Sequence, residues 1–219
     1  MTAEPQQQPQ APDAAPQHPE AEQLLTFVRQ YAVPLAAGVA VAVAAYMGVS
    51  VYRGHRQALR AEAQNALQAA RTIEELRAVA QDYSQTPAAP PALLEMGSQY
   101  VHNGEFPMAR QAYARFLERY PDHMLVPSAM LGEACALEGQ QQFEQALERY
   151  RQFRERYGDH YLAPAAVLGE GRTLQQMGRL EEARTVYEDF IAARPDSRWR
   201  DAAETSLLYV KKAIRARRG

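Results

Sequence analysis

Cysteine is almost absent from this chain of 219 residues, and neither sign of charge predominates. The single cysteine, Cys135, excludes an intrachain disulfide framework and any metal site built from several cysteines. The 24 basic and 26 acidic residues give a formal net charge of −2, which argues against holding nucleic acid through a strongly basic surface. A phosphate-binding glycine loop and the HExxH and GxSxG motifs are also missing. We therefore expect no enzyme activity, no metal or cofactor site and no nucleic-acid partner.

The first 22 residues contain no large aliphatic side chain that could build a core, and consist mainly of Pro, Gln and Ala. Five prolines between Pro5 and Pro19 prevent a continuous helix. The composition predicts that residues 1–22 form a disordered tail that acts as a spacer. A proline-rich ligand for a partner domain is the alternative, although a PxxP motif with a basic flank is missing.

Charge is absent between Gln30 and Tyr52, a stretch of 23 residues. As a helix this stretch would be about 34 Å long, which is enough to cross a hydrocarbon core of about 30 Å. Tyr31 and Tyr52 lie near its ends, where aromatic rings favour the membrane interface. We predict that the stretch is a transmembrane helix. A buried helix of a soluble protein, or a cleavable signal peptide with small residues at Ala42 and Ala44, are the alternatives.

The arginines beside this stretch bear on its orientation in a membrane. Arg29 precedes it, whereas Arg53, Arg56 and Arg60 follow soon after it. Taken alone, the positive-inside rule therefore places the C-terminal part of the chain in the cytoplasm.

A repeat of 37 residues runs through the rest of the chain. Several residue types recur in one register without an insertion, which indicates tandem structural units. The columns include Ala109, Ala146 and Ala183; Tyr113, Tyr150 and Tyr187; Phe116, Phe153 and Phe190; and Pro90, Pro127 and Pro164. We predict a repeat domain over residues 57–219, made of a degenerate repeat at 57–89, repeats at 90–126, 127–163 and 164–200, and a capping helix at 201–219.

Each unit has the pattern of two helices joined by a short turn. Proline suits the first turn of the first helix, and a small residue further along lets a neighbouring helix approach closely. In the second helix Ala, Tyr and Phe lie at i, i+4 and i+7, and so share one face. The small residues are Gly97, Ala134 and Gly171, and the turn glycines are Gly104, Gly178 and, in the middle unit, a position near Gly139.

These features resemble the tetratricopeptide repeat, with its small residue in the first helix, glycine in the turn, alanine and an aromatic residue in the second helix, and closing proline. The middle unit departs from the pattern, because Gly158 stands where Pro121 and Pro195 close the other two. The resemblance implies an all-α solenoid of helical hairpins that binds other proteins. The period of 37 residues is similar to that of a variant found in bacterial envelope proteins.

The N-terminal sequence QLLTFVRQYAVPLAAGVAVAVAAYMGVSVYRGHR adds a second resemblance. An amphipathic stretch, a basic residue, one span and an aromatic–arginine exit lead into tetratricopeptide-like repeats, as in YfgM-type ancillary translocon subunits. That resemblance implies a single-pass protein of the bacterial inner membrane with its repeats in the periplasm. It also implies contact with the secretion channel, with a membrane-bound folding factor and with emerging clients.

The predicted function is thus a membrane-anchored scaffold for protein–protein interactions in the cell envelope, with a role in secretion or in envelope protein assembly. One alternative is a self-assembling structural component, whose spans pair through Gly38 and Ala42 to give a homo-oligomer. Another is an adaptor whose repeats face the cytoplasm, as the arginine count indicates.

The tetratricopeptide resemblance also nominates a binding groove. In that family the first helices line the concave surface, and mixed polar side chains there suit the backbone of an extended peptide. Carried over to this chain, the groove residues are Ser98, His102, Glu138, Arg172, Gln175 and Gln176.

Structural roles are expected for the remaining candidates. His123 and His160 share one repeat position and are interpreted as solvated loop residues rather than metal ligands. Cys135 has no motif around it and is expected to be a small packed or groove residue.

The C-terminal sequence KKAIRARRG suits the C-terminal end of a helix dipole. Attraction to anionic lipid or to an acidic partner is the alternative. In the helix that contains this sequence, we expect Trp199, Leu207, Leu208 and Ile214 to cover the last hairpin.

Overall fold

The computed structural model describes residues 19–218, which form nine α-helices and no strand. The all-α prediction is therefore confirmed. Of the predicted tail, residues 1–18 lie outside the described residues, and helix α1 includes the rest. The helices are α1 (Pro19–Ala69), α2 (Ile73–Asp82), α3 (Ala89–His102), α4 (Phe106–Arg119), α5 (Val126–Gly139), α6 (Phe143–Tyr157), α7 (Ala163–Gln176), α8 (Leu180–Ala193) and α9 (Arg200–Arg218).

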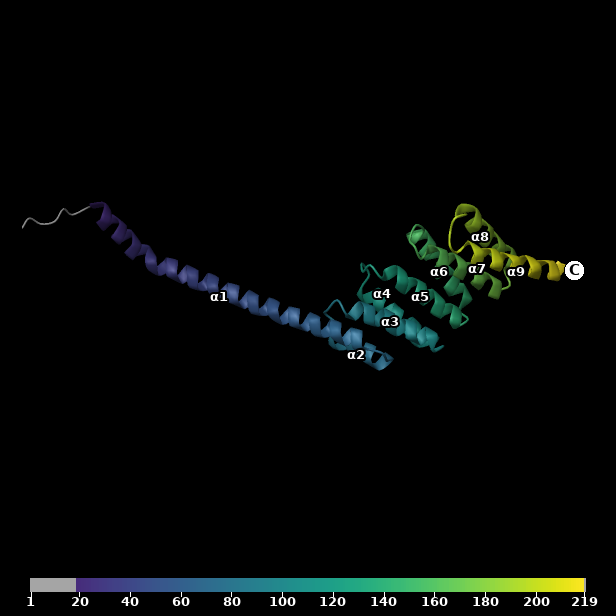
Figure 1. Cartoon of the computed structure of the whole chain (residues 1–219), viewed down its shortest axis with the longest axis horizontal. Coiled ribbons are helices and arrows are strands. Elements are labelled where there is room, and N and C mark those ends of the chain that lie inside the picture. Colours follow the sequence, from purple (N-terminus) through teal and green to yellow (C-terminus); the bar gives the residue numbers. More distant parts are fainter. Residues whose placement is uncertain (1–18, 219) are drawn as a thin grey trace, which may run out of the picture. The chain divides into compact units, whose positions relative to one another are not determined.

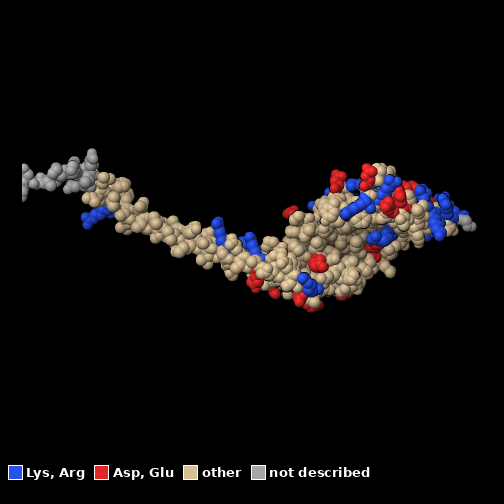
Figure 2. Space-filling view, in the orientation of Figure 1, with Lys and Arg blue, Asp and Glu red and all other residues tan. Residues whose placement is uncertain are grey.

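Helix α1 carries the uncharged stretch at residues 30–52. Pro34 lies inside the helix without ending it, and the side chains of residues 23–58 are all exposed. Among the described helices, this one is long and apolar enough to cross a membrane. Figure 2 shows the corresponding surface as a long tan stretch between blue side chains. By length and composition, α1 is a candidate membrane span.

Helices α3 to α8 form three consecutive hairpins (Figure 1), in which α3 pairs with α4, α5 with α6 and α7 with α8. Each first helix begins one residue before its repeat proline, so Pro90, Pro127 and Pro164 lie in the first turn. Proline is tolerated there because its missing N–H has no partner within the helix. Helix α2 precedes the hairpins, and α9 packs on α8 as an unpaired last helix.

The turn inside each hairpin needs a residue with positive φ. Gly104 and Gly178 have φ values of 76° and 74°, which glycine adopts without strain. In the middle hairpin this residue is Gln141, with φ of 60°, and not a glycine near 139. Gly139 instead ends α5, where an added Cβ would lie 2.4 Å from the ring of Phe106. The middle turn therefore directly follows Gly139, near the expected position, and its positive-φ residue is Gln141.

In each loop that leads into α3, α5, α7 or α9, one side chain accepts a hydrogen bond from a backbone amide near the start of the helix. Thr86, His123, His160 and Ser197 stand in one column of the repeat. Each accepts a hydrogen bond from the amide two residues later, with donor–acceptor distances between 3.1 and 3.3 Å. These bonds satisfy an amide at the start of the helix, which has no partner within the helix itself. The two histidines are thus half-buried structural residues of the loops.

The core follows the repeat columns, and the three alanines at Ala109, Ala146 and Ala183 are fully buried. In the degenerate first unit, Ala63 of α1 is buried in one cluster with Leu76 of α2.

At the other end of the domain, Trp199, Leu207 and Ile214 pack on the last hairpin as expected. Leu208 is 69% exposed, so the prediction that it covers this hairpin is wrong. The reason is helical geometry: Leu207, Val210 and Ile214 define the buried face of α9, and Leu208 lies about 100° away from Leu207 around the axis.

Three basic residues of α9 hold it against the last hairpin. Lys211 pairs with Glu188 at 2.8 Å, and Arg218 pairs with Glu181 at 2.6 Å. Arg217 donates to the carbonyl oxygen of the turn residue Gly178 at 3.0 Å. Three of the five basic residues in the sequence KKAIRARRG therefore bind groups of the last hairpin.

Candidate functional site

The first helices of the hairpins build one face of the solenoid. Helix α3 contacts α5, α5 contacts α7, and α7 contacts α9. The second helices α4, α6 and α8 instead contact mainly the first helices on either side, and grooves lie between them. Because the first helices approach one another more closely, the face formed by α3, α5, α7 and α9 is the concave one.

Tyrosines of the second helices reach between the first helices toward this face. Tyr113 of α4 lies between α3 and α5, where a Cβ added to Gly97 or Gly132 would lie 2.7 or 2.4 Å from its ring. At these glycines an added Cβ would overlap the aromatic ring, and the equivalent position of the middle hairpin carries another small residue, Ala134. The equivalent contacts further along are Tyr150 with Gly169 and Tyr187 with Gly171.

A charged cluster lies beside these tyrosines, between α5 and α7. Arg172 donates to both carboxylate oxygens of Glu138, from Nε at 2.6 Å and from Nη2 at 2.8 Å. The hydroxyl of Tyr150 donates to Glu138 Oε2 at 3.0 Å. The hydrogen bonds from Arg172 to the Glu138 carboxylate raise the pKa of Arg172 above its usual value. The guanidinium is therefore charged, held in place and neutralised by a group of the same chain.

Nucleophilic and metal chemistry have little basis in these residues. Cys135 lies 3.3 Å from the hydroxyl of Tyr150, and burial raises the pKa of its thiol. A raised pKa disfavours the thiolate, which is the reactive form of cysteine. Between residues 23 and 218, no three His, Cys, Asp or Glu side chains are grouped so that they could hold a metal ion. The face can bind by shape, hydrogen bonds and charge.

The structure brings part of the predicted groove together. Glu138 and Arg172 form the ion pair, and Gln175 Oε1 accepts a hydrogen bond from the hydroxyl of Tyr187 at 3.0 Å. Glu138 is only 8% exposed, so its carboxylate serves Arg172 and Tyr150 instead of facing an open groove as the sequence suggested. The other predicted residues, Ser98, His102 and Gln176, are exposed on α3 and α7.

The six predicted groove residues leave out three residues of the same repeat columns, of which only Cys135 was expected as a packed or groove residue. Cys135 and Tyr209 stand in the column of Ser98 and Arg172, and Lys212 follows Gln175 by 37 residues. Tyr209 and Lys212 are exposed on α9. The repeat register itself, extended by one step into the last helix, would have identified them. The concave face therefore continues from the hairpins onto α9.

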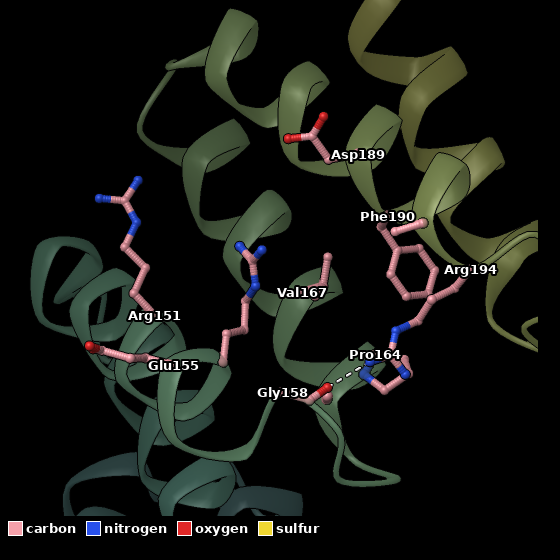
Figure 3. Close-up of a pocket in the computed structure, with 11 residues that line it drawn as sticks. Arg151, Glu155, Gly158, Pro164, Val167, Asp189, Phe190 and Arg194 are labelled. Carbon is pink, nitrogen blue, oxygen red and sulfur yellow. Dashed lines mark hydrogen bonds between the residues drawn. The ribbon is translucent and has the colours of Figure 1, made fainter.

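The grooves between the second helices differ from the concave face. One of about 470 Å³ lies between α6, α7 and α8 (Figure 3). Arg151 donates to Glu170 at 3.0 Å, and Arg154 pairs with the same buried carboxylate. Arg194 donates to the carbonyl oxygen of Gly158 at 2.7 Å, drawn as a dashed line in Figure 3. These arginines join neighbouring hairpins, so their guanidinium groups already bind oxygen atoms of the same chain.

Stacked hairpins of this length and register define a tetratricopeptide-type solenoid. The sequence matches the family described as "Tetratricopeptide repeat-like domain" over residues 26–211, and the chain belongs to this family. The match includes the apolar part of α1 as well as the hairpins.

Solved structures show the same fold at low sequence identity. The nearly identical TPR-like repeats of a protein from Podosopora anserina, of the kinesin light chain type, superpose with a TM-score of 0.57 at 19% identity, covering 77% of this chain and 89% of that chain. A tetratricopeptide repeat protein from Parabacteroides merdae gives a TM-score of 0.53 at 15% identity, with 72% and 60% covered. MamA of AMB-1 gives 0.51 at 15% identity, with 73% and 82% covered. The sequence has no match among curated proteins.

Proposed function

We propose that the chain is a membrane-anchored scaffold that binds segments of other proteins on the concave face of its repeats. Tetratricopeptide-like repeats are protein–protein interaction scaffolds, and membership of that family supports the binding role. The observation that carries the proposal is the continuous row of α3, α5, α7 and α9, where exposed polar side chains stand on tightly packed helices. Rigid helices place such groups accurately for a ligand.

The anchor is the uncharged stretch of α1 at residues 30–52. Its side chains are exposed in the chain, which is unfavourable in water over so many turns but suits surrounding lipid. The family match also begins within this helix, at residue 26, which supports an anchor that belongs with the repeats.

The proposed location is the inner membrane of a bacterium, with the repeats in the periplasm and a role in secretion or envelope protein assembly. The resemblance to YfgM-type subunits supports this orientation, whereas Arg53, Arg56 and Arg60 support the opposite one. Fusions of alkaline phosphatase and of green fluorescent protein to the C-terminus decide between them. Phosphatase activity without fluorescence is expected; fluorescence without phosphatase activity would assign the repeats to the cytoplasm.

The binding face is tested by photo-crosslinking from the full chain in its native membrane. A photoreactive amino acid at Ser98 or Gln176 should crosslink partner proteins, because both side chains are exposed on the concave side. The same amino acid at Glu118, exposed on the second helix α4, is the matched control and should give no such products. Equal crosslinking from all three positions would remove the assignment of the concave face.

A charge exchange adds a second test of the same face. Arg172→Glu alone would leave two acidic groups together, one of them buried, so it should reduce both stability and binding. Combined with Glu138→Arg, it restores an ion pair of opposite direction and should recover stability. If the double variant is stable and keeps all crosslinked partners, the pair takes no part in recognition.

Self-association through α1 is a second candidate function. An added Cβ at Gly38 has no other atom within 4 Å, and Ala42, one turn further on, is exposed, so the helix side that carries both is open to another helix. Light scattering of the full chain in detergent tests this, and a monomer would exclude it.

A further inference from the structure

Helix α9 has a side that no other described helix covers. A second helix packs on each of α3, α5 and α7, whereas within the described residues none follows α9. Leu208 and Tyr209 of α9 are 69% and 67% exposed. Leu208 stands in the repeat column of Gly97 and Gly171, the column that accepts a tyrosine ring from the second helix. No described second helix packs on Leu208, so this side chain and Tyr209 give α9 an exposed apolar surface.

Positive charge lies on the same side of α9. Lys212 and Arg215 are exposed, and within the described part of the chain neither forms an ion pair, unlike the neighbouring Lys211, which is bound to α8. Leu208, Lys212 and Arg215 lie at i, i+4 and i+7, so one helix side carries all three. Figure 2 shows blue side chains gathered at the right of the view, where the C-terminal end of α9 lies.

The charge of the rest of the concave face differs from that of α9. Arg172 is neutralised by Glu138, and at the start of the face the exposed residue Glu95 on α3 is acidic, not basic. Free positive charge on this face is therefore concentrated at its α9 end. A bound segment that presents carboxylates to this end therefore has the most favourable electrostatic interaction with the face.

We propose that the side of α9 formed by Leu208, Tyr209, Lys212 and Arg215 is a docking surface for an acidic segment of a partner protein. A large apolar side chain of the segment contacts Leu208 and Tyr209, and carboxylates following it pair with Lys212 and Arg215. The inference rests on the proposed scaffold function and names the class of segment that the scaffold takes.

A protein segment fits this surface better than a lipid surface does. Two free cations attract anionic lipid only weakly, because the effect adds up over many basic residues. A segment can instead follow the concave face, where neighbouring first helices lie about 8–10 Å apart. Roughly eight extended residues reach from α3 to α9, so a short peptide can occupy the whole face.

The test uses the full chain in detergent and fluorescein-labelled peptides with the sequence Gly-Ser-Gly-Leu-Ser-Phe-Gly-Glu-Glu-Glu-Glu-Ser. Two further peptides replace the four glutamates by Gln or by Lys. Fluorescence anisotropy should give at least tenfold tighter binding for the acidic peptide than for the amide peptide. The difference should shrink as the salt concentration rises.

The variants separate the apolar and the charged contributions. Lys212→Glu with Arg215→Glu should weaken the acidic peptide at least tenfold and strengthen the lysine peptide. Leu208→Ala with Tyr209→Ala should weaken all three peptides. The matched controls are Tyr161→Ala, which removes a side chain that is 68% exposed in a loop, and Arg156→Glu on α6; both should bind the acidic peptide within twofold of wild type.

Several results would overturn the proposal. Equal affinities for the acidic and amide peptides would remove it, as would an unchanged affinity in the double charge variant. The variant Tyr209→Trp tests for lipid binding. A shift of its tryptophan fluorescence in phosphatidylglycerol nanodiscs, but not in phosphatidylcholine nanodiscs, would assign the surface to lipid. A dimer lost in Leu208→Ala with Tyr209→Ala would assign it to a second copy of the chain. If Ser98 and Gln176 still crosslink partners while no acidic preference is seen, this inference fails and the scaffold function remains.

Discussion

Glycine and alanine are frequent both in the apolar part of α1 and in the repeat hairpins, but their surroundings are opposite. All described side chains from residue 23 to residue 56 are exposed, and an added Cβ at Gly38 or Gly48 would meet nothing within 4 Å. In the hairpins, an added Cβ at Gly169 or Gly171 would lie 2.4 or 2.3 Å from a tyrosine ring. Small residues are tolerated in the first region and required in the second, so residue type alone does not define the environment.

Arginine substitutions should give the largest contrast between the regions. Ala146 is fully buried between helices, and Ala146→Arg should destabilise the repeats by about 4 kcal/mol or more, since it adds bulk and an unpaired charge. Thermal unfolding followed by circular dichroism, on the full chain in detergent, measures this.

The matched change in the other region is Ala44→Arg. It should leave the melting temperature unchanged but oppose membrane insertion by roughly 3 kcal/mol, seen as extraction by alkaline carbonate. A wild-type melting temperature for Ala146→Arg would show that the repeat register is misassigned.

Adding one methyl group to a glycine should give the next largest effect. Gly171→Ala places a Cβ against Tyr187 and should cost about 2 kcal/mol, because ring and helix must move apart. Gly48→Ala should leave the unfolding of the repeats unchanged, since its surroundings are open. Urea titration of both variants compares them, and equal midpoints would contradict the contrast.

Replacing a loop histidine should lower the free energy of unfolding by about 1 kcal/mol, whereas replacing a histidine of α1 should not. His160→Ala removes the acceptor for the Leu162 amide, which should cost about 1 kcal/mol, as loss of a helix cap does. His160→Ser should restore much of this, because Ser197 has the same role in its loop. His55→Ala, at an exposed position of α1, is the control and should be neutral.

The smallest effect is expected at two glutamines of the repeat domain, and its sign should depend on their backbone conformation. Gln141→Gly relieves the cost of a positive φ and should stabilise the middle hairpin by about 0.5–1 kcal/mol. Gln64→Gly, in the helical backbone of α1, should destabilise by up to about 1 kcal/mol. Destabilisation of both variants in thermal unfolding would mean that Gln141 is not strained.

Patterns along the chain were sufficient for the elements and for their order. The proline columns predicted the starts of α3, α5 and α7 to within a residue or two, because the fixed φ of proline suits the first turn of a helix. The middle turn was expected near Gly139; its positive-φ residue is Gln141, the position that the 37-residue register gives from Gly104. The tetratricopeptide family and the fold followed from the same columns.

The groove could be located only in part. Ser98 and Gln176, which the resemblance nominated, are exposed, and their place in a binding groove stays a prediction. The carboxylate of the buried Glu138 is paired with Arg172, which lies 34 residues away on the neighbouring first helix α7. Such a pair is set by the distance and angle between stacked hairpins, and local sequence patterns carry no information on either.

The sequence by itself determined the helical hairpins, their period of 37 residues and the uncharged stretch of α1, since periodicity, proline position and missing charge are local properties. The tertiary structure decided which charges remain free. It neutralised Arg172, turned Lys211, Arg217 and Arg218 back onto the last hairpin, and left Lys212 and Arg215 exposed beside Leu208. Whether a charge is free depends on which groups stacking places next to it, and stacking joins residues that are distant in the chain.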